Sequence, residues 1–168
     1  QLAVRTIANA AAKKLGLPLQ ELDFTLPAAR LEKTQFSPDQ LVVFGTPVYY
    51  AHPSGRVQSF LDRVFYSSSR SLAFKPGASV AVARRGGTSA SFDVMNKYFG
   101  ISQMPVAGST YWNIVHGRVP GEASLDEEGM QTMRNLARNL AWMMKCFALG
   151  KENGVPYPDT ERKCQTNF

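Results

Sequence analysis

The sequence predicts an α/β domain in which helices cover both faces of a parallel sheet. Two apolar runs, Leu41–Phe44 and Ala78–Ala83, show no alternation of polar and apolar residues, which is typical of strands buried on both faces. A loop follows each run, and apolar residues at helical spacing follow each loop. Strands that alternate with helices in this way favour a doubly wound parallel sheet.

Length and composition fit one soluble globular domain over residues 1–168, because 44% of the residues are hydrophobic and 19% are charged. No stretch approaches the ~18 consecutive apolar residues of a membrane span. The net charge of +6 is scattered along the chain, which argues against a nucleic-acid-binding stripe. It suits either a solvated basic surface or phosphate-bearing small ligands.

The two cysteines and two histidines have no metal-ligand spacing. Two cysteines are too few for an iron–sulfur cluster, which takes about four. They also favour a reducing, cytoplasmic location.

The first half of the chain has four further predicted segments. Residues 2–15 are predicted to form a helix and residues 17–24 a short strand. After the run at 41–44, Ser54 is the predicted N-cap of a helix over Val57–Tyr66. The serine-rich stretch 67–71 is predicted to be a polar loop.

In the second half, a helix of about three turns is expected around residues 92–99, and a third strand over Pro105–Thr110. The last helix has the clearest signals, since Ser124 and Glu127 form a possible capping box and Gly150 marks its end. Its expected core face consists of Met133, Leu136, Leu140, Met144 and Phe147.

The two loops Thr46–Ser54 and Arg84–Ser89 follow predicted strands, and ligands of open α/β sheets bind at the carboxyl ends of strands. The first loop offers the aromatic rings of Tyr49 and Tyr50, and the second offers two guanidinium groups, two glycines and two hydroxyls. Together they suit a planar, hydrogen-bonding, anionic ligand such as a flavin. An ordinary connection that carries two surface tyrosines explains the first loop equally well.

Motifs for other chemistry are absent, including a Gly-x-Ser-x-Gly elbow, a Walker-type phosphate loop and a paired His/Glu metal motif. By contrast, several segments resemble the flavodoxin-like NADPH-dependent FMN reductases in order and spacing. They are FGTPVYYAHPSGRVQSFLDRVFY, ARRGGTSASFDVMNKYFGISQMPV, YWNIVHG, DEEGMQTMRNLARNLAWMMKC and the closing TNF. The resemblance covers about residues 39–168.

This resemblance implies a flavodoxin-like three-layer sandwich with a five-stranded parallel sheet, one FMN per subunit, and usually a homodimer. It implies two groups of residues along opposite sides of the isoalloxazine ring: Pro47, Val48, Tyr49 and Tyr50 at one, and Arg84, Arg85, Gly86, Gly87 and Thr88 at the other. The segment Tyr111–Gly117 could reach the flavin of the neighbouring subunit.

The family begins with a strand and a loop that holds the FMN phosphate at the amino end of the first helix. This sequence starts at about that helix. We therefore expect residues upstream of Gln1 in the natural protein to form the strand and the loop. We also expect an unfilled groove between the strands at 19–24 and 41–44.

The function implied is an FMN-dependent oxidoreductase that takes hydride from NADPH, or from NADH, and reduces a quinone, azo compound, nitro compound or free flavin. Backbone amides near Tyr49 and Tyr50 and a positive charge from Arg84 or Arg85 would serve the ring, with no side chain acting as acid, base or nucleophile. Two alternatives stay open. A flavodoxin-type electron carrier usually has an acidic surface, unlike this basic chain. A flavin-free interaction module on the same fold is the other.

Overall fold

The computed structural model describes residues 9, 13, 16, 40–161 and 164–166. Within them, the sheet consists of β1 (Val42–Tyr49), β2 (His52–Pro53), β3 (Gly77–Ala83) and β4 (Ile114–His116). The helices are α3 (Gly55–Leu72), α4 (Thr88–Ile101), α5 (Glu127–Glu152) and the short 3₁₀ helix η1 (Glu122–Ser124). The strand predicted at 17–24 and the groove beside it lie outside the described residues, as does almost all of the helix predicted at 2–15.

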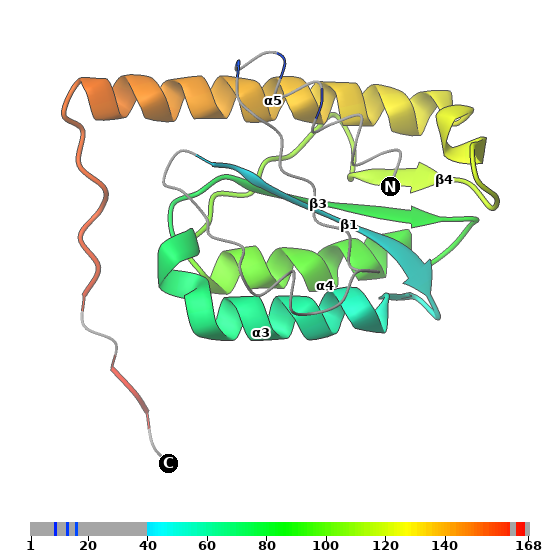
Figure 1. Cartoon of the computed structure of the whole chain (residues 1–168), viewed down its shortest axis with the longest axis horizontal. Coiled ribbons are helices and arrows are strands. Elements are labelled where there is room, and N and C mark those ends of the chain that lie inside the picture. Colours follow the sequence, from blue (N-terminus) through cyan, green and yellow to red (C-terminus); the bar gives the residue numbers. More distant parts are fainter. Residues whose placement is uncertain (1–8, 10–12, 14–15, 17–39, 162–163, 167–168) are drawn as a thin grey trace.

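The described elements form three layers, with α3 and α4 on one face of the sheet and α5 on the other (Figure 1). The strand order is β2-β1-β3-β4. β1 and β3 are adjacent and parallel, with Val42 opposite Gly77 and Pro47 opposite Val82. β3 and β4 are also parallel. The predicted parallel pair and its helical cover on both faces are therefore confirmed.

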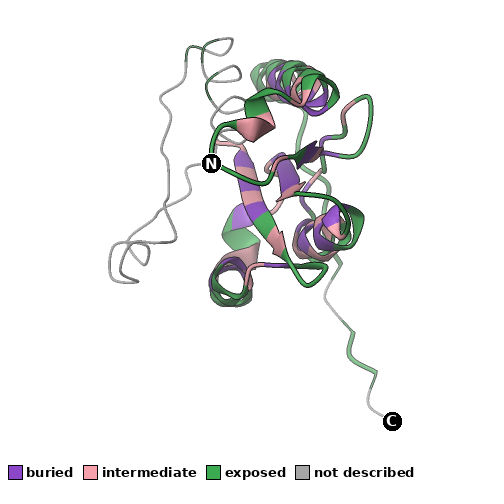
Figure 2. Ribbon diagram, turned by 90° about the vertical axis from the view of Figure 1, so that its right-hand side faces the viewer, coloured by how far each residue is buried: buried purple, intermediate pink, exposed green. Residues whose placement is uncertain are grey.

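Two apolar clusters hold the layers together, one on each face of the sheet. Phe44 of β1 stacks on Phe99 of α4, with ring centroids 5.8 Å apart, in a cluster shared with α3. On the other face, Val80 and Val115 lie in one cluster with Leu136 of α5. Figure 2 shows this burial along the strands and on the inward sides of the helices. The unbroken apolar runs in the sequence reflect this cover on both faces.

The prediction of a loop at 67–71 is wrong, because α3 continues without a break to Leu72. Ser67 Oγ donates to the carbonyl oxygen of Arg63, 2.8 Å away and one turn earlier, so its polar group is satisfied within the helix. Leu72 is fully buried in the cluster below β1. Burial of that leucine offsets the weak helix preference of the serines.

The prediction of a strand over Pro105–Thr110 is also wrong. Only Val106 forms an isolated bridge, with Gly77, and the pairing strand is β4, further along the chain. Side chains hold the stretch after the bridge to α5 instead. Ser109 Oγ donates to the carbonyl oxygen of Thr132 at 2.6 Å, and Asn139 Nδ2 donates to that of Gly108 at 2.8 Å.

The start of α5 is capped by Asp126 rather than by the predicted box of Ser124 and Glu127. Asp126 Oδ1 accepts from the backbone N–H of Gly129 at 2.9 Å. Ser124 belongs to η1, where its hydroxyl donates to the carbonyl oxygen of Gly121 at 2.6 Å. The serine is therefore occupied one turn before α5 begins.

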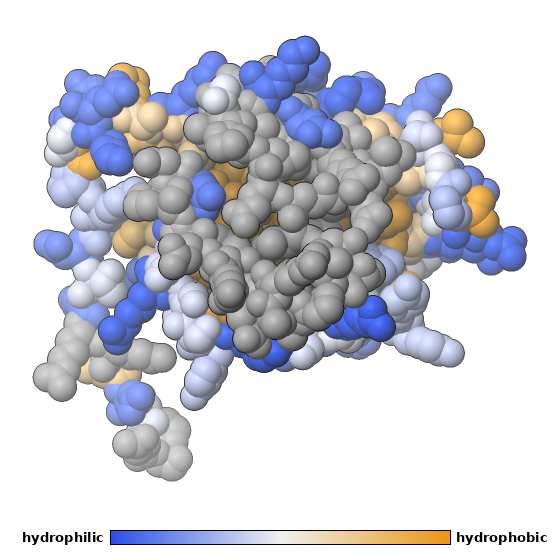
Figure 3. Space-filling view, viewed as in Figure 1, coloured by the Kyte–Doolittle hydropathy of each residue, from blue (hydrophilic) through white to orange (hydrophobic). Residues whose placement is uncertain are grey.

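The second half of α5 is more exposed than its apolar pattern predicts. Met133, Leu136 and Leu140 are fully buried as expected, but Phe147 is 38% exposed, and the helix continues past Gly150 to Glu152. This half extends beyond the ends of β1 and β3 in Figure 1. In Figure 3, apolar side chains appear near both ends of α5 on a mostly hydrophilic outline.

None of the helices in the described part of the chain is long and apolar enough to cross a bilayer.

Candidate functional site

The first segment of the candidate site is a tight hairpin at the carboxyl end of β1. The predicted loop over Thr46–Ser54 is partly strand, because β1 continues to Tyr49 and pairs antiparallel with β2, placing Tyr49 opposite His52. Tyr50 and Ala51 form the turn between them with φ of 50° and 63°. Two residues at positive φ suit the twist of a hairpin, but they are strained when neither is glycine. The hairpin presents two exposed rings, since Tyr49 is 62% and Tyr50 fully exposed.

Thr46 anchors this hairpin to the start of α3. Its buried hydroxyl accepts from the backbone N–H of Ser54 at 2.9 Å and donates to the carbonyl oxygen of Pro47 at 2.8 Å. Ser54 is the N-cap of α3, as predicted, and its hydroxyl accepts from the N–H of Val57 at 3.4 Å. The structural role of Thr46 was not predicted, because its partners lie up to eight residues away.

The second segment, residues 84–88, contacts the hairpin through Gly87. A Cβ atom on Gly87 would lie 2.7 Å from Ala51 Cα and 2.8 Å from Val48 Cγ1. Gly87 also has φ of +88°, which favours glycine. The backbones of the two segments thus approach too closely for a side chain at this position. The structure therefore brings together the two loops that the sequence predicts to form one site.

Gly87 is the N-cap of α4 and makes no side-chain cap hydrogen bond. Thr88 begins the helix and is buried, whereas Arg84, Arg85 and Gly86 are exposed. The first N–H groups of a helix have no partner within the helix, and the helix dipole makes this end partly positive. This end of α4 can bind carbonyl oxygens or an anionic group.

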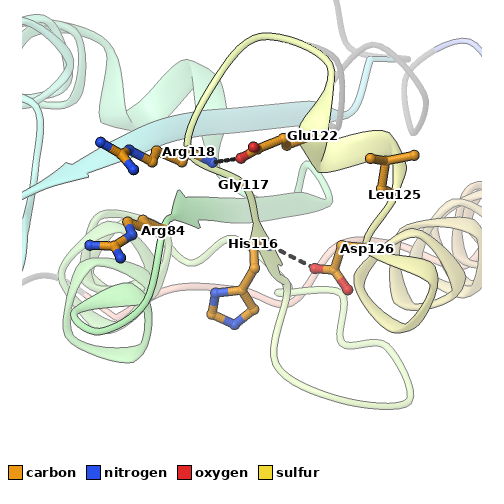
Figure 4. A pocket seen from close by; sticks show the side chains of 7 residues that line it. All are labelled: Arg84, His116, Gly117, Arg118, Glu122, Leu125 and Asp126. Carbon is orange, nitrogen blue, oxygen red and sulfur yellow. Dashed lines mark hydrogen bonds between the residues drawn. The ribbon is translucent and has the colours of Figure 1, made fainter.

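The third segment of the candidate site follows β4 and begins beside the end of β3. Residue 83 is opposite His116, and the backbone N–H of Gly117 donates to the carbonyl oxygen of Ala83 at 3.0 Å. An open pocket of about 480 Å³ lies here (Figure 4). It is lined by Arg84, His116, Gly117, Arg118, Glu122, Leu125 and Asp126.

Only part of this pocket was predicted. The sequence drew attention to Arg84 and to the segment 111–117, but Arg118, Glu122, Leu125 and Asp126 were missed. Finding them would have required the position of β4, which its three residues do not reveal.

Glu122 holds the pocket loop in place. Its Oε2 accepts from the backbone N–H groups of Arg118 at 2.7 Å and Val119 at 3.1 Å. These hydrogen bonds lower the pKa of Glu122 below its usual value, and the charges of Arg118 and Arg84 add to the effect. Glu122 is therefore ionised at neutral pH.

The aromatic pair Tyr111 and Trp112 lies before β4 rather than at its carboxyl end. The ring centroids are 5.2 Å apart, and each side chain is 54% exposed. The segment 111–117 is thus divided by β4, with only its last residues in the pocket. Its implied contact with a neighbouring subunit stays a prediction.

In the described part of the chain, no group of three or more His, Cys, Asp or Glu side chains could hold a metal ion.

Comparison of sequences places this geometry in a known family. The model of the NADPH-dependent FMN reductase family matches residues 11–118, well over half of the chain. Two iron–sulfur flavoproteins of Methanocaldococcus jannaschii are 30% and 27% identical to the chain over 115 and 118 residues. Each match covers 62% of this chain and 58% or 59% of the relative, so the chain spans less than two thirds of their length.

These relatives are named for an iron–sulfur cluster, but the 168 residues of this chain supply only Cys146 and Cys164 as thiolate ligands.

Solved structures with the same fold have little sequence identity to the chain. A WrbA-like flavodoxin of Agrobacterium tumefaciens has a TM-score of 0.57 at 16% identity, covering 85% of this chain and 90% of its own. An oxidoreductase of Corynebacterium diphtheriae has a TM-score of 0.60 at 15% identity, covering 83% and 85%. A flavodiiron core of Synechocystis has a TM-score of 0.63 at 14% identity, covering 86% and 32%.

The strand order, the paired loops at the carboxyl edge and these matches agree. The chain belongs to the NADPH-dependent FMN reductase family and has a flavodoxin-like fold.

Proposed function

We propose that this chain binds FMN at the carboxyl edge of its sheet and is the flavin-binding part of an NAD(P)H-dependent oxidoreductase. One observation carries the proposal above the others. The contact of Gly87 with the hairpin brings the segment that carries the exposed Tyr49 and Tyr50 against the uncapped end of α4. Such an arrangement offers stacking area and hydrogen-bond donors to one planar ligand.

The residues present fit the ring of FMN. Pro47, Val48, Tyr49 and Tyr50 would border one side of it. Along the other edge, the backbone N–H groups of residues 86–88 would donate to the carbonyl oxygens of its pyrimidine part. The close approach at Gly87 leaves no room for a side chain between the two segments. Bound FMN would supply hydride acceptance from the nicotinamide and electron transfer to an acceptor.

The protein's contribution is binding and electrostatics. The guanidinium groups of Arg84 and Arg85 precede the uncapped end of α4, and both arginines are exposed. Positive charge placed there stabilises negative charge that develops on the ring as it gains electrons. No side chain of this edge needs to act as an acid, base or nucleophile.

The name of the family supports NADPH as the donor, and the names of the relatives support a flavin. We further propose a small acceptor such as a quinone, an azo or nitro compound or free flavin, a cytoplasmic location, and a homodimer or higher homo-oligomer. Sedimentation of the purified protein at several concentrations tests the last point, and a monomer throughout would contradict it.

The experiment for the main proposal follows the visible flavin absorbance of the purified natural protein. We expect the protein to bind FMN and to lose its flavin absorbance when mixed anaerobically with NADPH. Bleaching by dithionite but not by NADPH or NADH would instead favour an electron carrier. Failure to bind FMN would favour a flavin-free interaction module.

A further inference from the structure

We propose that the pocket between the ends of β3 and β4 binds the 2′-phosphate of NADPH, with Arg84 and Arg118 as its ligating side chains. This inference rests on the proposed function, because it takes the dinucleotide as the hydride donor. It adds a binding subsite and a reason for the enzyme to prefer NADPH to NADH.

The two arginines are held side by side by the sheet. Each follows closely after a strand end, and these strand ends are joined by the hydrogen bond from Gly117 N–H to the carbonyl oxygen of Ala83. Neighbouring strands lie about 4.8 Å apart, so the segments that follow β3 and β4 leave the sheet close to each other. In Figure 4 the side chains of Arg84 and Arg118 extend to the same side of β4.

Both guanidinium groups have N–H donors that are available to a ligand. Within the described residues, neither side chain donates a hydrogen bond or forms an ion pair. Both carboxylates of the pocket are already occupied by backbone N–H groups. Glu122 accepts from residues 118 and 119, and Asp126 accepts from His116 at 2.6 Å and from Gly129 at 2.9 Å.

The charges are also separated in space. In Figure 4 the guanidinium groups lie on one side of the β4 end, and the carboxylates of Glu122 and Asp126 lie on the other. Although the formal charges of these four groups cancel, an anion on the arginine side would meet two cations at short range. It would meet the two carboxylates only at longer range, across an open and solvated pocket.

The loop that carries Arg118 is fixed before any ligand arrives. A Cβ atom on Gly117 would lie 2.8 Å from the backbone nitrogen of Ala123, so η1 packs directly against the end of β4. Glu122, in the same 3₁₀ helix, accepts from the N–H of Arg118. A preorganised loop loses little conformational entropy on binding.

A phosphate monoester matches this pair of arginines. Each planar guanidinium can donate two parallel hydrogen bonds to phosphate oxygens, and the group carries close to two negative charges at neutral pH. The pocket of about 480 Å³ is open to solvent, so the rest of a dinucleotide can leave it. Residues 84–88 connect the pocket directly to the hairpin, where the nicotinamide end would meet the flavin.

The test measures binding of 2′-phospho-ADP-ribose and of ADP-ribose to the flavin-loaded protein by titration calorimetry. These two ligands lack the nicotinamide and differ only in the 2′-phosphate, so binding is read without catalysis. We expect the phosphorylated ligand to bind more tightly to the unmodified protein. Arg118→Gln should weaken its binding about tenfold and leave ADP-ribose binding unchanged.

Arg70→Gln is the matched control. It removes the same charge from the exposed last turn of α3, at the opposite edge of the sheet, and should leave both affinities unchanged. Equal affinity of the two ligands for the unmodified protein would overturn the proposal. Equal weakening of both by Arg118→Gln would also overturn it, because the diphosphate common to both ligands would then be the group bound.

Glu122→Gln gives a change of opposite sign. The amide keeps an oxygen that can accept from the backbone N–H groups of residues 118 and 119, but it removes a negative charge near both arginines. We expect binding of 2′-phospho-ADP-ribose to become several-fold tighter. Weaker binding by this variant would show that the loop serves only as a scaffold and would overturn the assignment.

Failure of this inference can be told apart from failure of the proposed function. If FMN does not bind, or NADPH does not reduce it, the proposed function is wrong. If FMN binds and NADPH reduces it, while the two ligands bind alike, only the 2′-phosphate site is wrong. As a further readout, Arg118→Gln should raise KM for NADPH and leave KM for NADH unchanged.

Discussion

Gly87 joins the two loops of the candidate site, and both its backbone and its surroundings require glycine. Its φ of +88° lies in the left-handed region, and its Cα faces the backbone of Ala51. Gly121, by comparison, has φ of +95° but nothing within 4 Å of a Cβ position. Alanine substitutions at these two glycines therefore separate the free-energy cost of a positive φ from the cost of the clash at Gly87.

Gly87→Ala should lower the free energy of unfolding by about 3 kcal/mol or more, because strain at positive φ adds to a clash with backbone atoms. Gly121→Ala should cost only about 1–2 kcal/mol. Urea denaturation of both variants measures the difference. Gly87→Ala should also weaken FMN binding, and equal costs for the two variants would contradict a close contact between the loops.

The arginines after β3 should differ in their effect on the flavin. Arg84 lines the pocket beside β4, so we expect Arg85 to be the cation nearer to the edge of the proposed flavin ring. Charge-assisted contacts contribute about 1.5–3 kcal/mol, and about 1.4 kcal/mol corresponds to 30 mV in a two-electron couple. Arg85→Ala should therefore lower the midpoint potential by some tens of millivolts, and Arg84→Ala should lower it less.

A redox titration of both variants provides the measurement. Two unshifted potentials would mean that the arginines only solvate a turn, and the assignment of residues 84–88 to the ring edge would be lost.

The start of α5 shows how one side chain joins an element to the site. Asp126 caps the helix through Gly129 and also accepts from the backbone N–H of His116, at the end of β4. The same carboxylate therefore fixes the helix start and the pocket wall. Ser124, the cap that the sequence suggests, bonds only within the preceding turn.

Asp126→Ala should lower the free energy of unfolding by about 1–2 kcal/mol, since the N-cap and the bond to β4 are both lost. Ser124→Ala should change it by less than about 0.5 kcal/mol. Chemical denaturation of the two variants distinguishes the caps, and a larger loss for the serine variant would contradict the observed start of α5.

At the scale of the whole molecule, the site depends on all three layers. The clusters on the two faces fix β1 and β3 in register, and the register puts the hairpin, residues 84–88 and the end of β4 along one edge. Within the layer of α3 and α4, Tyr98 donates a hydrogen bond to the carboxylate of Asp62. Partial burial and this carboxylate raise the pKa of Tyr98 to about 12.

A raised pKa in the folded state makes the stability of the molecule depend on alkaline pH. The contribution of Tyr98 is fully present below the unfolded pKa of about 10, and it is lost as the pH rises from there towards 12. Tyr98→Phe should therefore reduce the loss of stability over this range. Tyr66→Phe, at an exposed tyrosine on α3, is the control and should not. Equal pH profiles for the two variants would contradict the contact with Asp62.

Local patterns in the sequence were enough to predict the two central strands and the helices that follow them, although β1 continues to Tyr49, inside the predicted loop. Burial on both faces produces an unbroken apolar run, and one buried helix face produces a period of about 3.6, so both are visible in neighbouring residues. Ser54 was predicted as a cap for the same reason, because its partner Val57 is three residues away. The resemblance to the family added a prediction of which residues lie at the flavin.

Only the tertiary structure decided the features that depend on distant partners. The serines at 67–71 stay helical because Leu72 is buried under β1, and the segment 105–110 leaves the sheet because α5 holds its polar groups. Gly87 contacts Ala51, and Arg84 and Arg118 line the same pocket. The two members of each pair are 34 or more positions apart in the sequence. Such contacts follow from how strands pair and layers pack, and no window of neighbouring residues contains that information.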